Sequence, residues 1–167
     1  MTITPPRIER APEPTTEKLT ALDRLELLCD PGTVRTIRSS ITSRRMGAKA
    51  RPGDGVMGGS GLVDGRPVFV YSQDVSFAGG SLGAAHADTI VRVLQLAREA
   101  RVPAIGFIES GGARMQEGTA ALGGYGRIFR EHVRASGVIP QISVICGTSA
   151  GGGCYAPAED EIGRAHV

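Results

Sequence analysis

Hydrophobic positions in the first part of the chain follow a helical period. Four leucines recur at intervals of three residues: Leu19, Leu22, Leu25 and Leu28. This spacing predicts a helix that begins near Thr15 and Thr16 and ends at the Asp-Pro-Gly turn of residues 30–32. Residues 1–14 contain four prolines and little apolar content, which is typical of a flexible leader.

Beyond Gly55, short apolar runs alternate with helical patterns. Residues 56–63 and 67–71 flank Asp64 and Gly65, and this arrangement predicts a β-hairpin. The other predicted elements are a helix over 82–100, a buried strand over 104–108, a helix over 117–135, a buried strand over 141–146 and a helix that begins near 151. Because strands alternate with helices, we expect right-handed βαβ crossovers and an α/β layered fold.

The composition excludes several classes of protein. Aromatic residues make up 4% of the chain, and a net charge of +2 is low, so we expect no nucleic-acid partner. No apolar run is long enough for a membrane span, which needs about 18 residues. The three histidines make no metal-ligand spacing and the three cysteines form no CxxC pair. These features predict a soluble cytoplasmic protein with no metal site and no membrane partner.

Positive charge is concentrated in one stretch that contains no acidic residue. Six cations lie within it: Arg35, Arg38, Arg44, Arg45, Lys49 and Arg51. Such a run is usually a solvated face, and the alternative is a site for phosphate or for an acidic partner.

Each predicted buried strand is followed by a turn of small residues that leads into a helix. These turns are residues 110–114 (SGGAR) and 147–153 (GTSAGGG). Glycine lets a ligand approach the backbone, and helix N-termini present unpaired N–H groups to an anion. Two converging turns would form an oxyanion hole from the main chain alone. The alternative is that the glycines only turn the chain tightly.

One catalytic motif other than these turns fits the pattern. Gly147-x-Ser149-x-Gly151 follows a strand and precedes a helix, which is the setting of the nucleophile in an α/β-hydrolase. That alternative needs an acid and a histidine downstream, where only His166 is present. His86 lies on a predicted helix, and we interpret it as packed rather than catalytic.

Several spaced motifs together resemble a known family. They are residues 53–56 (GDGV), 64–68 (DGRPV), 79–82 (GGSL), 110–118 (SGGARMQEG) and 135–143 (ASGVIPQIS). The sequence resembles the biotin-dependent acyl-CoA carboxylase β chain, the carboxyltransferase subunit, and within it the propionyl-CoA carboxylase β chain and methylmalonyl-CoA decarboxylase large subunit. The resemblance runs from about Leu19 to about Ala158 and matches only the amino-terminal domain of that family. It therefore predicts a truncated acyl-CoA carboxyltransferase domain over 15–160.

The resemblance implies an incomplete crotonase-like (ClpP/crotonase) ββα spiral. It also implies transfer of a carboxyl group from carboxybiotin to the α-carbon of an acyl-CoA, with propionyl-CoA as the first choice. Carried over by motif, the oxyanion donors are the main-chain N–H groups of two segments: Gly111, Gly112 and Ala113, and Ala150, Gly151 and Gly152. On this interpretation Ser149 is a turn residue.

The same resemblance implies a substrate site and partners. Gly79, Gly80 and Ser81 would line the CoA channel, and Arg114 or the basic stretch would meet the CoA phosphates. Biotin would be carried on a partner, a biotin carboxylase or biotin carrier subunit, and the full-length subunit would be a homo-oligomer, a hexamer. We expect the fragment to be inactive alone. The alternatives are a methylmalonyl-CoA-type decarboxylase subunit and a non-catalytic CoA-binding module.

The last seven residues, 161–167 (EIGRAHV), depart from the family pattern. They can be encoded by GAG ATC GGA AGA GCA CAC GTC, which resembles a common sequencing-adapter sequence. We interpret them as an adapter artefact rather than as protein.

Overall fold

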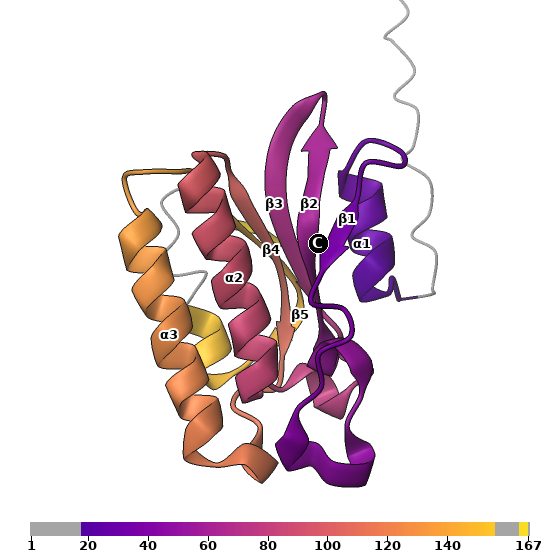
Figure 1. Cartoon of the computed structure of the whole chain (residues 1–167), viewed down its shortest axis with the longest axis vertical. Coiled ribbons are helices and arrows are strands. Elements are labelled where there is room, and N and C mark those ends of the chain that lie inside the picture. The colour runs from indigo at the N-terminus through magenta and orange to yellow at the C-terminus, as the bar shows by residue number, and fades with distance from the viewer. Residues whose placement is uncertain (1–17, 156–163, 167) are drawn as a thin grey trace, which may run out of the picture.

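The computed structural model describes residues 18–155 and 164–166 and shows a mixed sheet with helices on both faces (Figure 1). The six strands lie in chain order: β1 Arg35–Ile37, β2 Val56–Val63, β3 Arg66–Gln73, β4 Ala104–Ser110, β5 Gln141–Ser149 and β6 Arg164–His166. The α-helices are α1 Ala21–Leu28, α2 Ala84–Ala100 and α3 Thr119–Ala135. Short 3-10 segments complete the fold: η1 Arg44–Lys49, η2 Pro52–Gly55, η3 Ala78–Gly80, η4 Met115–Glu117 and η5 Gly151–Cys154.

The predicted hairpin is confirmed. Strands β2 and β3 pair antiparallel from Val56 opposite Gln73 to Val63 opposite Arg66. The Asp30 carboxylate accepts hydrogen bonds from the N–H groups of Asp64 and Gly65, at 3.0 and 2.8 Å. The turn that ends α1 therefore also holds the hairpin.

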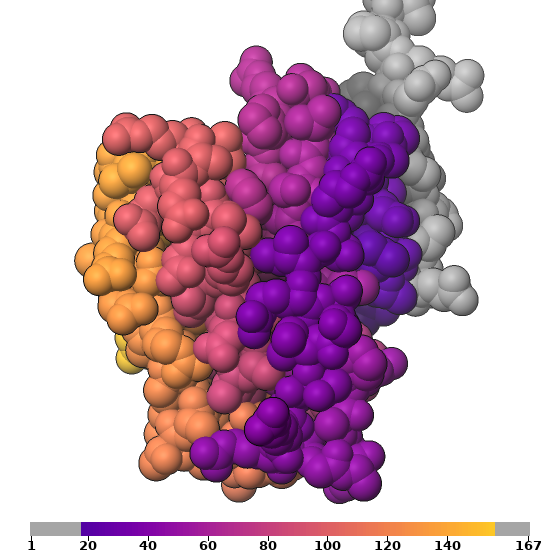
Figure 2. Space-filling model, in the orientation of Figure 1, coloured from indigo at the N-terminus to yellow at the C-terminus, as the bar shows by residue number. Residues whose placement is uncertain are grey.

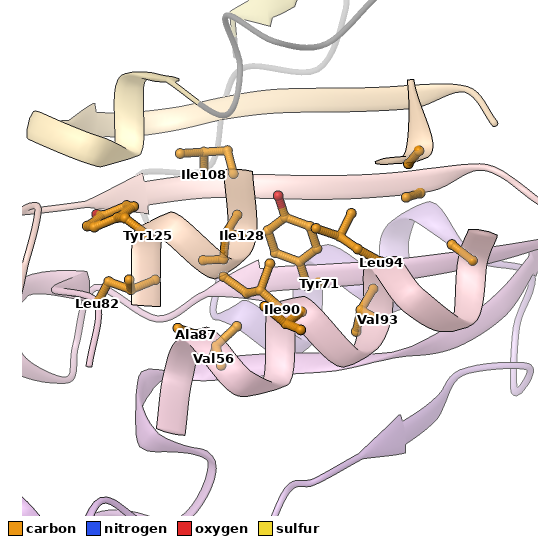
Figure 3. Close-up of a cluster of buried hydrophobic side chains, with 14 of the residues drawn as sticks. Val56, Tyr71, Leu82, Ala87, Ile90, Val93, Leu94, Ile108, Tyr125 and Ile128 are labelled. Atoms are coloured by element: carbon orange, nitrogen blue, oxygen red, sulfur yellow. The ribbon is translucent and has the colours of Figure 1, made fainter. Parts of the chain in front are cut away.

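Two crossovers build the parallel half of the sheet. Helix α2 connects β3 to β4, helix α3 connects β4 to β5, and both strand pairs are parallel, as predicted. The two helices cover the same face of the sheet, and side chains such as Ile90, Ile108 and Ile128 meet between the layers (Figure 3). This layer forms the main core, and it holds the carboxyl ends of β3, β4 and β5 at one edge.

Helix α1 covers the opposite face with a smaller apolar cluster. Leu25 and Cys29 pack there against residues of β3 and β4. The helix begins at Ala21, because Thr20 and Asp23 form a capping box with hydrogen bonds of 2.9 and 3.2 Å. Residues 15 and 16, where the sequence predicts the helix to begin, lie outside the described residues, and residues 18–20 are not helical.

The basic stretch folds in a way that its sequence does not indicate. Its first part forms β1, which pairs antiparallel with β2, and its second part forms η1. In Figure 2 the segment that contains η1 and η2 lies against α2 and beside η4. This segment had no periodicity in the sequence, and its position over the start of α2 comes from tertiary contacts.

The two ends of the chain leave two predictions open. The proposed leader, residues 1–14, lies outside the described residues. Residues 164–166 form β6, which pairs in parallel with β5, while their proposed origin as an adapter artefact stays a prediction. Among the described helices, none combines the length and the hydrophobicity that crossing a membrane requires.

Candidate active site

Three segments meet at the edge where the parallel strands end. The segment 79–82 follows β3, the turn 110–114 follows β4, and the turn 149–153 follows β5. Gly111 N donates to Gly79 O at 3.0 Å, and Ala150 N donates to Ser110 O at 2.9 Å. The structure thus brings the predicted donor turns and the predicted CoA-channel residues together. In α/β sheets, ligands bind outside the carboxyl ends of the strands, which is where this edge lies.

The predicted oxyanion donors divide into two groups. Three N–H groups are engaged inside the protein: Gly111 with Gly79 O, Gly112 with the Ser110 hydroxyl at 3.2 Å, and Ala150 with Ser110 O. The other three, those of Ala113, Gly151 and Gly152, have no acceptor within the described part of the chain. The first group shapes the turns, and the second leaves a donor on each turn for a ligand.

Packing and backbone conformation both favour glycine in the two turns. A Cβ on Gly152 would lie 2.6 Å from the Tyr125 ring, which leaves no room for a side chain in the second turn. Gly112 and Gly151 also have positive φ angles of 92° and 54°. Tyr125 lies in the core layer beneath this turn (Figure 3). The bare backbone at this edge therefore follows from packing as well as from turn geometry.

Arg114 does not occupy the position that the sequence predicted for it. Its side chain is 0% exposed, and its guanidinium donates to Asp54 Oδ1 at 2.5 Å, to Glu117 Oε1 at 3.0 Å and to Ser81 O at 2.9 Å. A guanidinium enclosed in this way cannot meet the phosphates of a ligand on the surface. The predicted phosphate contact of Arg114 is corrected accordingly, and the exposed basic residues of η1 remain candidates.

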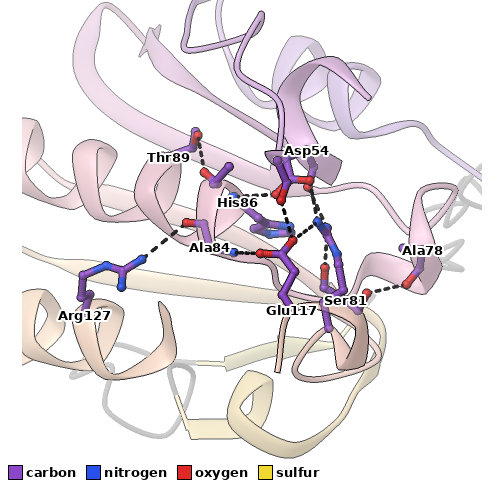
Figure 4. Close-up of polar contacts among 11 residues, drawn as sticks. Asp54, Ala78, Ser81, Ala84, His86, Thr89, Glu117 and Arg127 are labelled. Atoms are coloured by element: carbon purple, nitrogen blue, oxygen red, sulfur yellow. Dashed lines mark hydrogen bonds and ion pairs between the residues drawn. The ribbon is translucent and has the colours of Figure 1, made fainter. Parts of the chain in front are cut away.

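Two acidic residues at this site were missed by sequence reasoning. Glu117 accepts the Ala84 N–H and Asp54 accepts the His86 N–H, each at 2.9 Å, so both carboxylates cap the start of α2 (Figure 4). Asp54 lies between two glycines and has a positive φ angle of 51°. Glu117 lies three residues after Arg114. These are weak local signals, because no sequence pattern reports that residues 54 and 117 meet.

The pKa values of the two carboxylates shift in opposite directions. It raises the pKa of Asp54 above its ordinary value, although hydrogen bonds from Arg114 and the His86 N–H act in the opposite direction. Burial also acts to raise the pKa of Glu117, but hydrogen bonds from Ala84, Ser43 and Arg114 outweigh it and hold that pKa below its ordinary value. The more extensive hydrogen bonding of Glu117 explains the difference.

His86 is part of the core beside this cluster. Its Nε2 lies 3.3 Å from the Gln73 side-chain amide, and its ring is fully buried. Burial, with a smaller contribution from the Arg114 charge, lowers the pKa of His86 to about 3. The ring is therefore neutral at physiological pH, in agreement with its interpretation as a packed residue.

Ser149 is held as a turn residue. Its hydroxyl donates to Gly153 O at 2.8 Å. The His166 side chain, which the hydrolase alternative requires, lies outside what the structure describes. The geometry favours the interpretation of Gly147-x-Ser149-x-Gly151 as a strand-to-helix turn.

Of two cavities among the described residues, a larger one lies away from the donor turns and a small one adjoins the second turn. One of about 330 Å³ lies under α1 and is lined mainly by apolar side chains, including Leu27, Phe107 and Val144. Another, beside Gly153 and Tyr125, measures about 20 Å³. Among the described residues there is no group of three or more His, Cys, Asp or Glu side chains placed to hold a metal ion.

Comparison with known proteins identifies the family. The profile of the carboxyl transferase domain matches residues 12–162. This chain belongs to the carboxyl transferase domain family. A propionyl-CoA carboxylase carboxyltransferase subunit from Haloferax mediterranei is 48% identical over 145 residues, which cover 84% of this chain and 28% of that protein. The methylmalonyl-CoA decarboxylase subunit alpha of Veillonella parvula is 47% identical over 145 residues, which likewise cover 84% of this chain and 28% of that protein.

Solved structures of the carboxyl transferase family support the fold. The hexameric transcarboxylase 12S, crystallised with methylmalonyl-coenzyme A and methylmalonic acid, matches with a TM-score of 0.86 and 38% identity. That match covers 89% of this chain and 30% of the transcarboxylase chain. The predicted crotonase-like ββα spiral, incomplete over this length, is confirmed. The chain spans about 28% of the length of the curated relatives it matches.

Proposed function

We propose that this chain is the amino-terminal part of the carboxyltransferase subunit of a biotin-dependent acyl-CoA carboxylase, with propionyl-CoA as its acyl-CoA substrate. The observation that carries the proposal is the pair of turns at the sheet edge. This chain belongs to the carboxyl transferase family. Its first turn offers the Ala113 N–H, and its second turn offers the N–H groups of Gly151 and Gly152.

The chemistry needs what these turns provide. Removing the α-proton of an acyl-CoA puts negative charge on the thioester oxygen, and N–H donors fixed around that oxygen lower the barrier. Main-chain donors do not titrate, so they act at any pH at which the protein is folded. The thioester oxygen would bind between Ala113 on one turn and Gly151 and Gly152 on the other.

The cavity that adjoins the second donor turn does not fit biotin. It measures about 20 Å³, lies among core side chains such as Ile108 and Ile128, and has room for about one water molecule rather than a bicyclic ring. We assign no residue of this chain to biotin, which in our proposal is carried by a biotin carboxylase or biotin carrier subunit. The contribution of this chain is to bind and polarise the acyl-CoA.

The remainder of the CoA site follows from the same edge. Gly79, Gly80 and Ser81 lie beside the first donor turn, and we propose that they line the CoA channel. With Arg114 buried, the exposed residues Arg44 and Arg45 of η1 are our candidates for the CoA phosphates. We further propose a cytoplasmic homo-hexamer, an assembly supported by the hexamer of transcarboxylase 12S.

A decarboxylase is the second candidate, because a relative with 47% identity is a methylmalonyl-CoA decarboxylase subunit. The same donors would stabilise the same enolate, formed there by loss of CO2. A non-catalytic CoA-binding module is the remaining alternative.

One assay separates these functions. The full-length subunit that carries this segment is combined with a biotin carboxylase and carrier subunit, ATP, labelled bicarbonate and propionyl-CoA. ATP-dependent label in the acyl-CoA is the expected result. Release of CO2 from methylmalonyl-CoA without incorporation identifies the decarboxylase, and CoA binding with neither reaction identifies the binding module.

A further inference from the structure

A buried ionic cluster lies directly behind the first donor turn. Asp54 comes from η2, Arg114 precedes η4 and Glu117 ends it, and the three side chains meet at the start of α2 (Figure 4). Each is at most 1% exposed as a side chain. The cluster therefore joins three segments that are distant in the sequence.

The guanidinium of Arg114 is held on several sides. One terminal nitrogen donates to Asp54 Oδ1 at 2.5 Å and to Glu117 Oε1 at 3.0 Å. The other donates to Asp54 O at 3.0 Å and to Ser81 O at 2.9 Å, and the group lies 5.0 Å from the centre of the Phe77 ring. A planar guanidinium can make these bonds together because they use two of its nitrogens. A lysine has a single ammonium nitrogen and cannot make the same set of bonds.

The main chain connects this cluster to the donor. Arg114 directly follows Ala113, and its own N–H donates to Leu82 O at 2.9 Å. Leu82 N donates in turn to Gly112 O at 2.8 Å, so the residue on each side of Ala113 is bonded to Leu82. The Arg114 side chain also donates a hydrogen bond to the carbonyl oxygen of Ser81, which precedes Leu82 in the chain.

Stability alone does not explain such a cluster. Replacing a buried ion pair with apolar residues of similar volume is often neutral or stabilising. Charged groups with many directional bonds do, however, determine the position of the backbone that they contact. Here that backbone carries a proposed oxyanion donor.

We propose that Arg114 is a positioning residue, held by Asp54 and Glu117, that sets the orientation of the Ala113 N–H toward the thioester oxygen of the substrate. This inference rests on the proposed function. It assigns Arg114 an indirect part in catalysis, with no contact between its side chain and the substrate.

The test uses the full-length subunit assembled with its biotin-bearing partner and the variants Arg114→Lys, Asp54→Asn and Glu117→Gln. The probe is propionyl-CoA labelled with 13C at the thioester carbonyl, whose infrared stretch moves to lower frequency when N–H groups donate to it. We expect the variants to lose part of that shift and at least about tenfold in kcat. The Kd for free CoA, which has no thioester, should stay within about twofold.

The matched control is Arg127→Lys on α3, which alters a half-exposed ion pair with Asp88 of α2 at 2.8 Å and should change neither readout. Folded Arg114→Lys with an unchanged infrared shift and kcat would overturn the inference. Where Arg114→Lys or Asp54→Asn does not fold, the nearly isosteric Glu117→Gln decides in the same way. Absence of carboxyl transfer in the wild type would instead contradict the proposed function, so the two failures are distinguishable.

Discussion

At the scale of single residues, the chemistry that we propose for this chain uses main-chain N–H groups. The turns after β4 and β5 offer N–H groups, and the nearby side chains serve to hold those turns in place. Ser149 and Gly152 illustrate this division. The Ser149 hydroxyl makes a structural hydrogen bond, and the absence of a side chain at Gly152 leaves room for the Tyr125 ring.

We expect Ser149→Ala to keep most of the carboxyl-transfer activity in the full-length subunit. The hydroxyl contributes a hydrogen bond to Gly153 O at 2.8 Å, worth about 1 kcal/mol of stability, and no step of the proposed reaction uses it. Steady-state kinetics of labelled carboxyl transfer check this. A loss of several orders of magnitude in folded protein would support the hydrolase alternative instead.

Gly152→Val should have the opposite effect. A Cβ at this position lies 2.6 Å from the Tyr125 ring, so a branched side chain must displace the turn and with it the N–H donors of Gly151 and Gly152. We expect kcat to fall by at least about 100-fold. Ser149→Ala in the same turn is the control, and a Gly152→Val enzyme with wild-type kcat would show that this turn holds no donor.

His86 predicts how stability depends on pH. The unfolded chain binds a proton on this residue below the ordinary pKa of 6.5, whereas the folded chain does so only near pH 3. In that window the unfolded state binds more protons, so the free energy of unfolding falls as pH falls, by at most about 1.4 kcal/mol per pH unit.

The variant His86→Gln, which stays neutral, should therefore show a shallower loss of stability between about pH 6 and pH 4.5. Urea unfolding at a series of pH values measures the slope. The lowered pKa values of Glu109 and Glu117 contribute acid sensitivity of the same sign and remain in the variant. An unchanged slope would mean that His86 titrates normally in the folded protein.

At the scale of elements, close packing of α2 against α3 positions the edge. A Cβ on Gly124 would lie 2.7 Å from the Cβ of Ala87 and 3.2 Å from a methyl group of Leu82. Leu82 is hydrogen-bonded to Gly112 and to Arg114, the two neighbours of Ala113 in the chain. Leu82 therefore contacts the α2–α3 interface and also holds the first donor turn by hydrogen bonds.

Two glycines on α3 give a matched test of this packing. Gly124→Ala should lower the free energy of unfolding by about 1–3 kcal/mol, because the added methyl group overpacks the interface. Gly126→Ala, where nothing lies within 4 Å of an added Cβ, should raise it by up to about 1 kcal/mol through helix propensity. Chemical denaturation of both variants checks the pair, and equal effects would contradict the close approach.

At the scale of the whole molecule, charge is arranged around the sheet edge. Arg44, Arg45 and Lys49 are exposed on η1 and form no ion pair among the described residues, while Arg114 is enclosed beneath the same segment. The basic stretch that the sequence singled out thus covers the cluster that positions the first donor turn.

Removing two of these charges, in Arg44→Ala/Arg45→Ala, should raise the Kd for CoA by about fivefold at low salt. The effect should shrink between about 0.1 M and 1 M salt, because the screening length falls from about 10 to 3 Å. Calorimetric titration with CoA measures it, and Arg66→Ala at the hairpin end of β3 is the control. A Kd equal to that of the wild type at every salt concentration would place the phosphates elsewhere.

Local patterns were sufficient for most of the fold. The hairpin at Asp64-Gly65, both long helices and the buried strands β4 and β5 follow from periodicity and turn residues, since these depend on neighbours in the chain. Strand β1 was not predicted, because it is stabilised by pairing with β2 rather than by its own sequence. Strand β5 reaches Ser149, beyond the predicted end at 146, for the same reason: its last residues pair with β4.

The sequence by itself determined the order of elements, the glycine-rich turns and the resemblance to carboxyltransferases, because each depends on residue type and spacing. Only the tertiary structure decided which N–H groups remain available, since Gly79 and Ser110 occupy those of Gly111, Gly112 and Ala150. It also decided that Arg114 is buried. Asp54 lies 60 positions away in the chain, and a contact over that separation exists only after the sheet has formed.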